Sequence, residues 1–153
     1  MGRAIHWKDI EGALGGAAGT AAFTGLMFGA QRAGLLGEMP PRKITRSLLE
    51  RTLEGRVSPA VVNASTAVAH LGFGIASGVA FAALSRRVHT RVPNVLLGAG
   101  FGAFVWAVSY VGWAPALNLM PAPNRDRRDR PIINLIGHLV FGGVLGALVR
   151  RRR

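Results

Sequence analysis

The chain contains no cysteine, which excludes disulfide bonds, thiolate nucleophiles and cysteine-ligated metals or clusters. Acidic residues are scarce as well, since seven Asp and Glu stand against 19 Lys and Arg, for a formal net charge of +12. None of these acidic residues falls within the four longest uncharged segments. A pair of carboxylates for acid-base chemistry is therefore missing from those segments, and we expect that the protein is not an enzyme.

The excess of positive charge raises the possibility of nucleic-acid binding. The basic residues, however, lie between long uncharged segments and not along one face of a helix. This placement is typical of the loops and helix ends of membrane proteins. We therefore expect no nucleic-acid partner and expect the lipid bilayer to be the main surroundings of the chain.

Half of the residues are hydrophobic and only 17% are charged. Four segments carry no charged side chain at all: residues 12–30, 60–84, 95–114 and 132–149. At a rise of ~1.5 Å per residue, a helix of such length crosses most of a ~30 Å hydrocarbon core. Buried helices of a soluble bundle are the alternative, but such helices need a polar face, which these segments almost lack. The sequence thus predicts an all-α bundle of four transmembrane helices within a single domain, residues 1–153.

A fifth, shorter helix is predicted in the first loop, over residues 41–53. Ile44, Leu48, Leu49 and Leu53 share one face of it, and charged side chains occupy the rest. This pattern indicates either an amphipathic helix in the membrane interface or a solvated helix that caps the bundle. Trp7, Tyr110 and Trp113 fall near predicted span ends, where amphipathic aromatic residues anchor.

Two groups of basic residues are candidates for contacts with lipid headgroups. They are Arg42, Lys43 and Arg46 in the first loop, and Arg127 and Arg128 in the last loop. The simpler interpretation of the last loop, residues 125–130, is a solvated segment whose Asp and Arg side chains compensate one another. The 19 basic residues divide almost evenly between the two sides of the membrane, and the arginines at 86–87 and 150–153 adjoin spans directly, which favours cytoplasmic termini.

The second and fourth spans resemble one another. His70-Leu71-Gly72-Phe73-Gly74 corresponds to His138-Leu139-Val140-Phe141-Gly142, and both spans end in paired arginines. Leu14-Gly15 and Leu97-Gly98 give a looser match between the first and third spans. We predict two parallel two-helix repeats, at about residues 8–87 and 94–153, related by a pseudo-two-fold axis along the membrane normal. Coincidence within a Gly- and Ala-rich sequence is the alternative.

Small residues recur at helical spacing along the spans. Such spacing lets the backbones of neighbouring helices approach closely. The predicted packing residues are Gly15, Gly19, Gly74, Gly78, Gly98, Gly102, Gly142 and Gly146, and Gly25 and Gly29 repeat the same spacing.

The candidate polar site consists of His70, His138, Asn63 and Asn134. Each histidine lies well inside a span, and an ionisable residue at that depth is a functional hypothesis by default. Three interpretations stay open: packing through hydrogen bonds, handling of protons or a solute near neutral pH, and ligation of one b-type haem. A metal site is not expected, because no carboxylate lies within any span.

The chain resembles the YagU-like family of small bacterial inner-membrane proteins. Pro40-Pro41-Arg42, the His70 helix with Phe73, and Gly137-His138-Leu139-Val140 carry this resemblance. It implies a multi-pass protein of the bacterial inner membrane without a settled activity. We expect an accessory or structural membrane subunit, in a larger complex or a homo-oligomer. The alternative is a small homo-oligomeric transporter, channel or proton-handling protein that uses the histidine pair.

Overall fold

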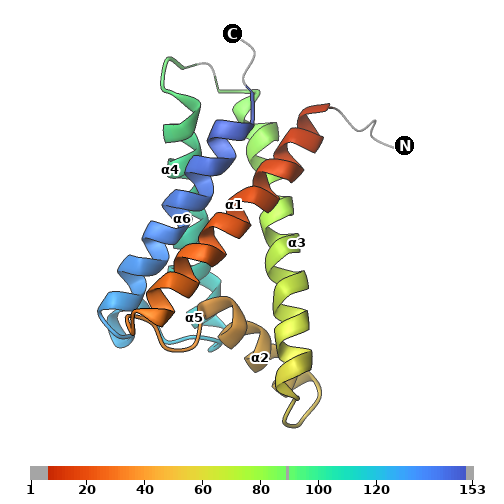
Figure 1. Cartoon of the computed structure of the whole chain (residues 1–153), viewed down its shortest axis with the longest axis vertical. Helices are drawn as coiled ribbons and strands as arrows, with labels where there is room; N and C mark the ends of the chain where they lie inside the picture. The colour runs from red at the N-terminus through yellow and green to blue at the C-terminus, as the bar shows by residue number, and fades with distance from the viewer. Residues whose placement is uncertain (1–6, 89, 151–153) are drawn as a thin grey trace.

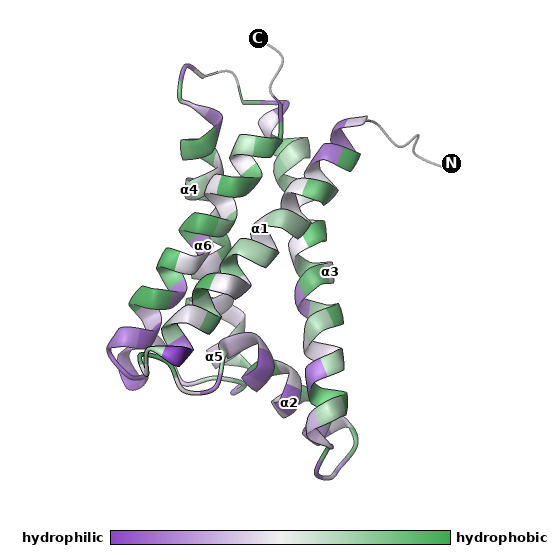
Figure 2. Cartoon of the chain, in the orientation of Figure 1, coloured by the Kyte–Doolittle hydropathy of each residue, from purple (hydrophilic) through white to green (hydrophobic). Residues whose placement is uncertain are grey.

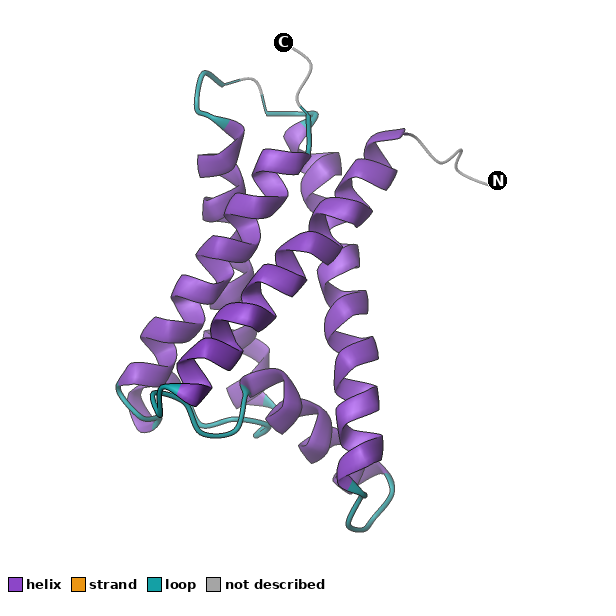
Figure 3. Cartoon of the chain, in the orientation of Figure 1, coloured by secondary structure: helices purple, strands orange, loops and turns teal. Residues whose placement is uncertain are grey.

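The computed structural model describes residues 7–88 and 90–150, so the terminal arginines at 151–153 lie outside it. Within these ranges every regular element is a helix, the helices are joined by loops and turns, and there is no strand (Figure 3). In chain order, the elements are α1 (Trp7–Arg32), α2 (Pro40–Thr52), α3 (Pro59–Ser85), α4 (Asn94–Trp106), the π-helical η1 (Ala107–Trp113), α5 (Ala114–Ala116), the 3-10 turn η2 (Pro123–Arg125) and α6 (Asp129–Leu148). The predicted all-α class is confirmed.

Four helical segments are long and apolar enough to cross a membrane: Trp7–Arg32, Pro59–Ser85, Asn94–Ala116 and Asp129–Leu148. The third comprises α4, η1 and α5 without interruption. Figure 2 shows hydrophobic residues along these segments and hydrophilic residues concentrated at their ends and on α2. The helices extend beyond the uncharged segments because their end turns include charged residues. Asp9 lies in the first turn of α1, and Asp129 lies in the first turn of α6.

Proline sets the start of two helices. Pro59 is at the first position of α3, after Ser58, whose hydroxyl accepts a hydrogen bond from the backbone N–H of Val61. Pro40 and Pro41 open α2. Proline suits a first turn because its missing N–H would have no helical partner there. The predicted boundaries of α2 and α3 therefore hold to within one or two residues.

The closest helix pairs are α1 with α3, α4 with α6, and α1 with α6. The start of α1 and the end of α6 lie at one end of the bundle, and α3 diverges from its neighbours toward the other end, where α2 lies across the opening (Figure 1). The helices are thus closer together at the end where α1 starts and farther apart at the end with α2.

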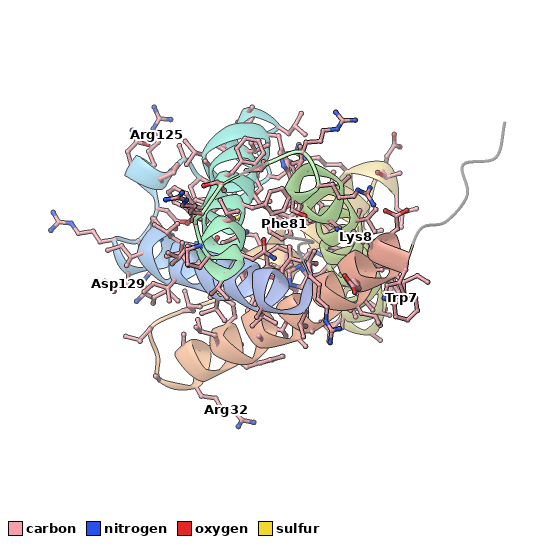
Figure 4. The ribbon with its side chains drawn as sticks, turned by 90° about the horizontal axis from the view of Figure 1, so that it is seen from above. Trp7, Lys8, Arg32, Phe81, Arg125 and Asp129 are labelled. Atoms are coloured by element: carbon pink, nitrogen blue, oxygen red, sulfur yellow. The ribbon has the colours of Figure 1, made fainter. Side chains whose placement is uncertain are left out.

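Aromatic and aliphatic side chains fill the part where the helices are closer together. Phe81, Ala82, Phe141 and Leu145 are at most 5% exposed and belong to one cluster. Phe81 also contacts Phe101 of α4 at 5.3 Å between ring centroids. Seen from above, Phe81 lies in the middle of the bundle, whereas the side chains of Arg32 and Arg125 project outward from its periphery (Figure 4).

Glycines bring the helices of two pairs into backbone contact. A Cβ added at Gly16 of α1 would lie 2.2 Å from the carbonyl oxygen of Gly74 of α3. At Gly98 of α4 it would lie 2.1 Å from the carbonyl oxygen of Gly142 of α6. The other predicted packing glycines also face a neighbouring helix, although Gly15 meets chiefly the side chain of Leu145, at 3.0 Å from its Cβ position. No atom lies within 4 Å of the Cβ position of Gly25 or Gly29. Within the described chain, the spacing of these two glycines therefore corresponds to no helix contact.

The third span changes its helical pattern halfway. Over Ala107–Trp113 the helix widens, and the backbone N–H of Ala114 donates to the carbonyl of Ser109, five residues earlier. Pro115 follows directly and has no N–H to donate. Wide turns of this kind occur frequently at functional sites, and this one faces the opening beneath α2.

Candidate functional site

A cavity of about 230 Å³ lies between α2, α3, η1 and the start of α6. Most of its wall is apolar or aromatic, and we call it the chamber. It is lined by Phe23, Pro40, Pro41, Ile44, Thr45, Leu48, Ala69, His70, Phe73, Ser109, Tyr110, Trp113, Ala114, Met120, Asn134 and His138. No charged side chain is among them. Pockets that bind small molecules commonly combine such an apolar wall with a few polar groups.

The two predicted histidines meet at Phe23 of α1. The ring centroid of Phe23 lies 5.3 Å from that of His70 and 5.0 Å from that of His138. Gly137 makes room for the phenyl ring, because a Cβ there would lie 2.8 Å from it. Phe23 was not predicted from the sequence; the missing side chain at Gly137, next to His138, was the available signal.

His138 has one hydrogen bond, from its Nδ1 to the backbone oxygen of Asn134 at 2.9 Å. A carbonyl oxygen only accepts, so Nδ1 carries the hydrogen, and in the neutral imidazole Nε2 is an acceptor. Two neighbouring polar atoms, Nε2 of His70 and Oδ1 of Asn134, are buried without a hydrogen bond from the described residues. Asn134 is only 2% exposed. Buried polar atoms without partners are rare and call for an explanation.

Of the four predicted site residues, the structure brings three together. His70, His138 and Asn134 line the chamber, whereas Asn63 lies in a neighbouring groove and accepts a hydrogen bond from Nε of Arg42 at 2.9 Å. Asn63 is therefore part of the contact between α2 and α3 and not of the chamber.

The groove runs between α1, α2 and α3, with a volume of about 1020 Å³. It shares Phe23, Pro41 and His70 with the chamber, so the two spaces adjoin. Small and apolar residues such as Ala17 and Ala21 line one part of it, and Glu38 and Arg42 line another.

Charged contacts hold α2 over this opening. Glu38, just before α2, pairs with Arg42 and, at 2.7 Å, with Nη2 of Arg46. Arg51 at the far end donates to the carbonyl oxygens of Leu117 and Asn118, both at 2.7 Å. The helix is thus tied to both neighbouring segments of the chain.

The carboxylate of Glu38 is stabilised in its charged form. Burial acts to raise its pKa, but the hydrogen bonds and positive charges of Arg46 and Arg42 together outweigh this, and the pKa is lowered. The guanidinium groups of Arg42 and Arg46, predicted to meet lipid headgroups, are therefore already paired within the protein. Arg127 and Arg128 are exposed, and Lys43 is half-buried.

A second polar cluster was not predicted. The hydroxyl of Tyr110 donates to Oδ2 of Asp126 at 2.6 Å, and Oδ1 of Asp126 pairs with Nη1 of Arg130 at 2.7 Å. The Asp126 side chain is 3% exposed and that of Arg130 is 11% exposed. The expectation of a solvated loop was wrong for these two residues, and the expectation of an interfacial Tyr110 was wrong because its side chain is buried. The cluster fixes Tyr110, and through it one wall of the chamber.

Fold and site define a small all-helical protein with four helices that could span a membrane and a largely apolar chamber under its short helix. Residues 8–153 match the model of a family of unknown function, DUF6789, and the chain belongs to this family. No curated protein and no solved structure matches the chain. None of these comparisons names the YagU-like family to which the motifs pointed.

Proposed function

We propose that this chain is a multi-pass membrane protein without catalytic activity that binds a small apolar molecule in the chamber beneath α2. The observation that carries the proposal is a largely apolar cavity whose wall holds the buried, unpartnered atoms Nε2 of His70 and Oδ1 of Asn134. In this view, the protein acts as an accessory subunit that holds a lipophilic molecule, alone, in a homo-oligomer or within a larger membrane complex.

The size of the chamber supports such a ligand. An apolar cavity of ~150 Å³ in another protein holds benzene, so the 230 Å³ of the chamber accommodates a somewhat larger group. The adjoining groove offers space for a longer apolar substituent. A molecule dissolved in the bilayer would reach both without passing through water.

The packing supports the proposal of two parallel repeats. Gly16 meets Gly74 as Gly98 meets Gly142, and Gly74 and Gly142 occupy the same place relative to His70 and His138. In this comparison, Gly16 of the first repeat corresponds to Gly98 of the second. The alignment based on Leu14-Gly15 and Leu97-Gly98 paired Gly15 with Gly98 and is therefore shifted by one residue. The second pair of glycines that this register implies, Gly78 and Gly146, also contacts the partner backbone, at 2.1 and 2.3 Å from the Cβ position.

We propose that α2 lies in the membrane interface and that the membrane is the bacterial inner membrane, with cytoplasmic termini. Charged residues of α2 and hydrophilic residues at the helix ends support the first part. The absence of native cysteine makes the topology testable with single cysteines at Lys8 and Arg127. In cells, an impermeant thiol reagent should label only Arg127→Cys; labelling of Lys8→Cys would contradict this orientation.

The geometry favours binding over the other uses of the histidine pair. The Phe23 ring contacts both imidazoles, while two axial ligands of one haem need a flat macrocycle between them. No hydrogen bond joins the two rings within the described part of the chain, and a phenyl ring relays no proton. We therefore propose that His70 and His138 form a polar wall of the binding site and that no haem or metal is bound.

A protection experiment tests the proposal. Ser109 lines the chamber, and Ser109→Cys introduces the only thiol. Nonylbenzene, added to the protein in lipid nanodiscs, should slow its reaction with a maleimide by about tenfold, the effect of occupying the site at ten times its dissociation constant. Ala76→Cys, on the exposed face of α3, is the matched control and should react at an unchanged rate. Equal rates at Ser109→Cys with and without nonylbenzene would contradict the proposal.

A further inference from the structure

Two polar atoms of the chamber are acceptors of hydrogen bonds, and a third, Nε2 of His70, donates or accepts according to its tautomer. His138 uses its Nδ1 hydrogen on the Asn134 backbone, which leaves Nε2 as an acceptor in the neutral ring. Oδ1 of Asn134 is a second acceptor, buried and without a partner. A ligand that satisfies these atoms must supply a donor.

The hydroxyl groups of the chamber wall cannot supply this hydrogen-bond donor, because each of them already donates to another group of the protein. Thr45 donates to the carbonyl of Pro41 at 2.9 Å, and Ser109 donates to the carbonyl of Val105 at 2.7 Å. Tyr110 donates to Asp126. The chamber therefore presents acceptors whose partner is not among its own hydroxyls.

The remaining wall specifies the rest of the ligand. No Asp, Glu, Lys or Arg side chain lines the chamber, so the ligand is neutral. Phe23, Phe73, Tyr110 and Trp113 surround it, which favours an aromatic ring through edge and offset stacking contacts. The groove that shares Phe23 with the chamber is lined by small and apolar residues along α1 and provides a path for a hydrocarbon chain.

We infer that the chamber recognises a phenolic hydroxyl on a long-chain hydrophobic molecule, with the hydroxyl donated to Nε2 of His138 or Oδ1 of Asn134 and the chain in the groove. This inference rests on the proposed function and names the chemical class of its ligand. The hydroxyl is bound deep in the chamber, and the hydrocarbon chain extends toward the bilayer between α1 and α3.

Binding of para-nonylphenol and of its methyl ether, para-nonylanisole, separates the inference from the proposal on which it rests. The two probes share ring and chain, and only the phenol donates a hydrogen bond. Affinities are measured for the protein in lipid nanodiscs, and unspecific partition is subtracted with Ala69→Phe, which adds a ring where Ala69 lines the chamber. The phenol should bind about tenfold more tightly, the usual effect of one hydrogen bond to a buried acceptor.

Equal affinities would overturn the recognition of the hydroxyl but leave the apolar site intact. No binding of either probe above that of Ala69→Phe would overturn the proposed function together with the inference. His138→Phe removes the acceptor and keeps an aromatic ring, so it should reduce the preference for the phenol. Because the comparison of the two probes uses the native chain, it holds even where this variant does not fold.

Discussion

The ring of Phe23 meets the imidazole of His138 nearly at right angles, at 82°, with 5.0 Å between centroids. This edge-on contact joins α1 to α6, and a tilted contact of the same ring with His70 joins α1 to α3. Phe23 is 3% exposed. A single side chain of the first span thus sets the distance between the two helices that carry the histidines.

Phe23→Ala should therefore lower the stability of the bundle. Removal of a buried ring leaves a cavity, at a cost of about 3 kcal/mol. Thermal unfolding in detergent measures the effect. Phe28→Ala, on the same helix but at a side chain that is 51% exposed, is the control and should change the melting temperature little. Equal shifts for both variants would contradict a central role for Phe23.

The glycine contacts predict opposite changes in stability for alanine at Gly98 and at Gly100, two residues further along α4. Gly98→Ala places a methyl group 2.1 Å from the carbonyl oxygen of Gly142, whereas no atom lies within 4 Å of a Cβ at Gly100. Overpacking should cost about 1–3 kcal/mol at Gly98. Gly100→Ala should be neutral or slightly stabilising, because Ala favours the helix. The melting temperatures of the two variants measure the effect. A loss of stability in Gly100→Ala as large as in Gly98→Ala would contradict the close contact between α4 and α6.

Asp126 is predicted to be essential for the position of Tyr110. Asp126→Asn removes the charge that pairs with Arg130, which is 11% exposed, and should destabilise the protein by about 3 kcal/mol, the cost of leaving a buried charge unpaired. Tyr110→Phe loses only one hydrogen bond and should cost about 1 kcal/mol. Chemical unfolding of the single and double variants measures the coupling; additive effects would show that the three residues do not act together.

The attachment of α2 should weaken in acid. The pKa of Glu38 is lowered by Arg46 and Arg42 against the opposing effect of burial. A group whose pKa is lower in the folded state contributes its full stability above the ordinary glutamate pKa of ~4.3, and the contribution disappears as the pH falls through the lowered value. Proteolytic cleavage of the α1–α2 loop should therefore increase as the pH falls below the ordinary glutamate pKa.

Glu38→Gln is the matched variant for this measurement. It cannot form the ion pairs, so its cleavage rate at neutral pH should approach that of the native chain in acid and should depend less on pH. The same acid response in both proteins would assign the effect to other carboxylates.

The spans and the short helix could be predicted from the sequence because both depend on local patterns. Uncharged segments of 18 or more residues indicate spanning helices. Ser58 followed by Pro59 marks the start of a helix whatever the helix packs against. Long-range contacts have no such local pattern. The spacing of Gly25 and Gly29 is the same as that of Gly98 and Gly102, but only the second pair meets a neighbouring helix.

The site could be predicted in part. His70 and His138 were found because imidazoles are rare inside apolar segments. Phe23 was missed because a phenylalanine in a span is ordinary, and its role depends on Gly137 of another helix. The contact of Tyr110 with Asp126 was missed for a similar reason, since the sequence of the last loop, with alternating Arg and Asp, is equally typical of a solvated segment.

The most direct test of the account is a map of where a hydrocarbon binds. A photoreactive nonylbenzene that carries a diazirine is illuminated with the protein in nanodiscs, and the labelled peptides are sequenced by mass spectrometry. Binding in the chamber predicts labels concentrated at residues such as Phe73, Ser109 and Trp113, and their loss in Ala69→Phe but not in Ala76→Phe. Labels spread evenly over the exposed faces of the four helices, and unchanged by Ala69→Phe, would contradict it.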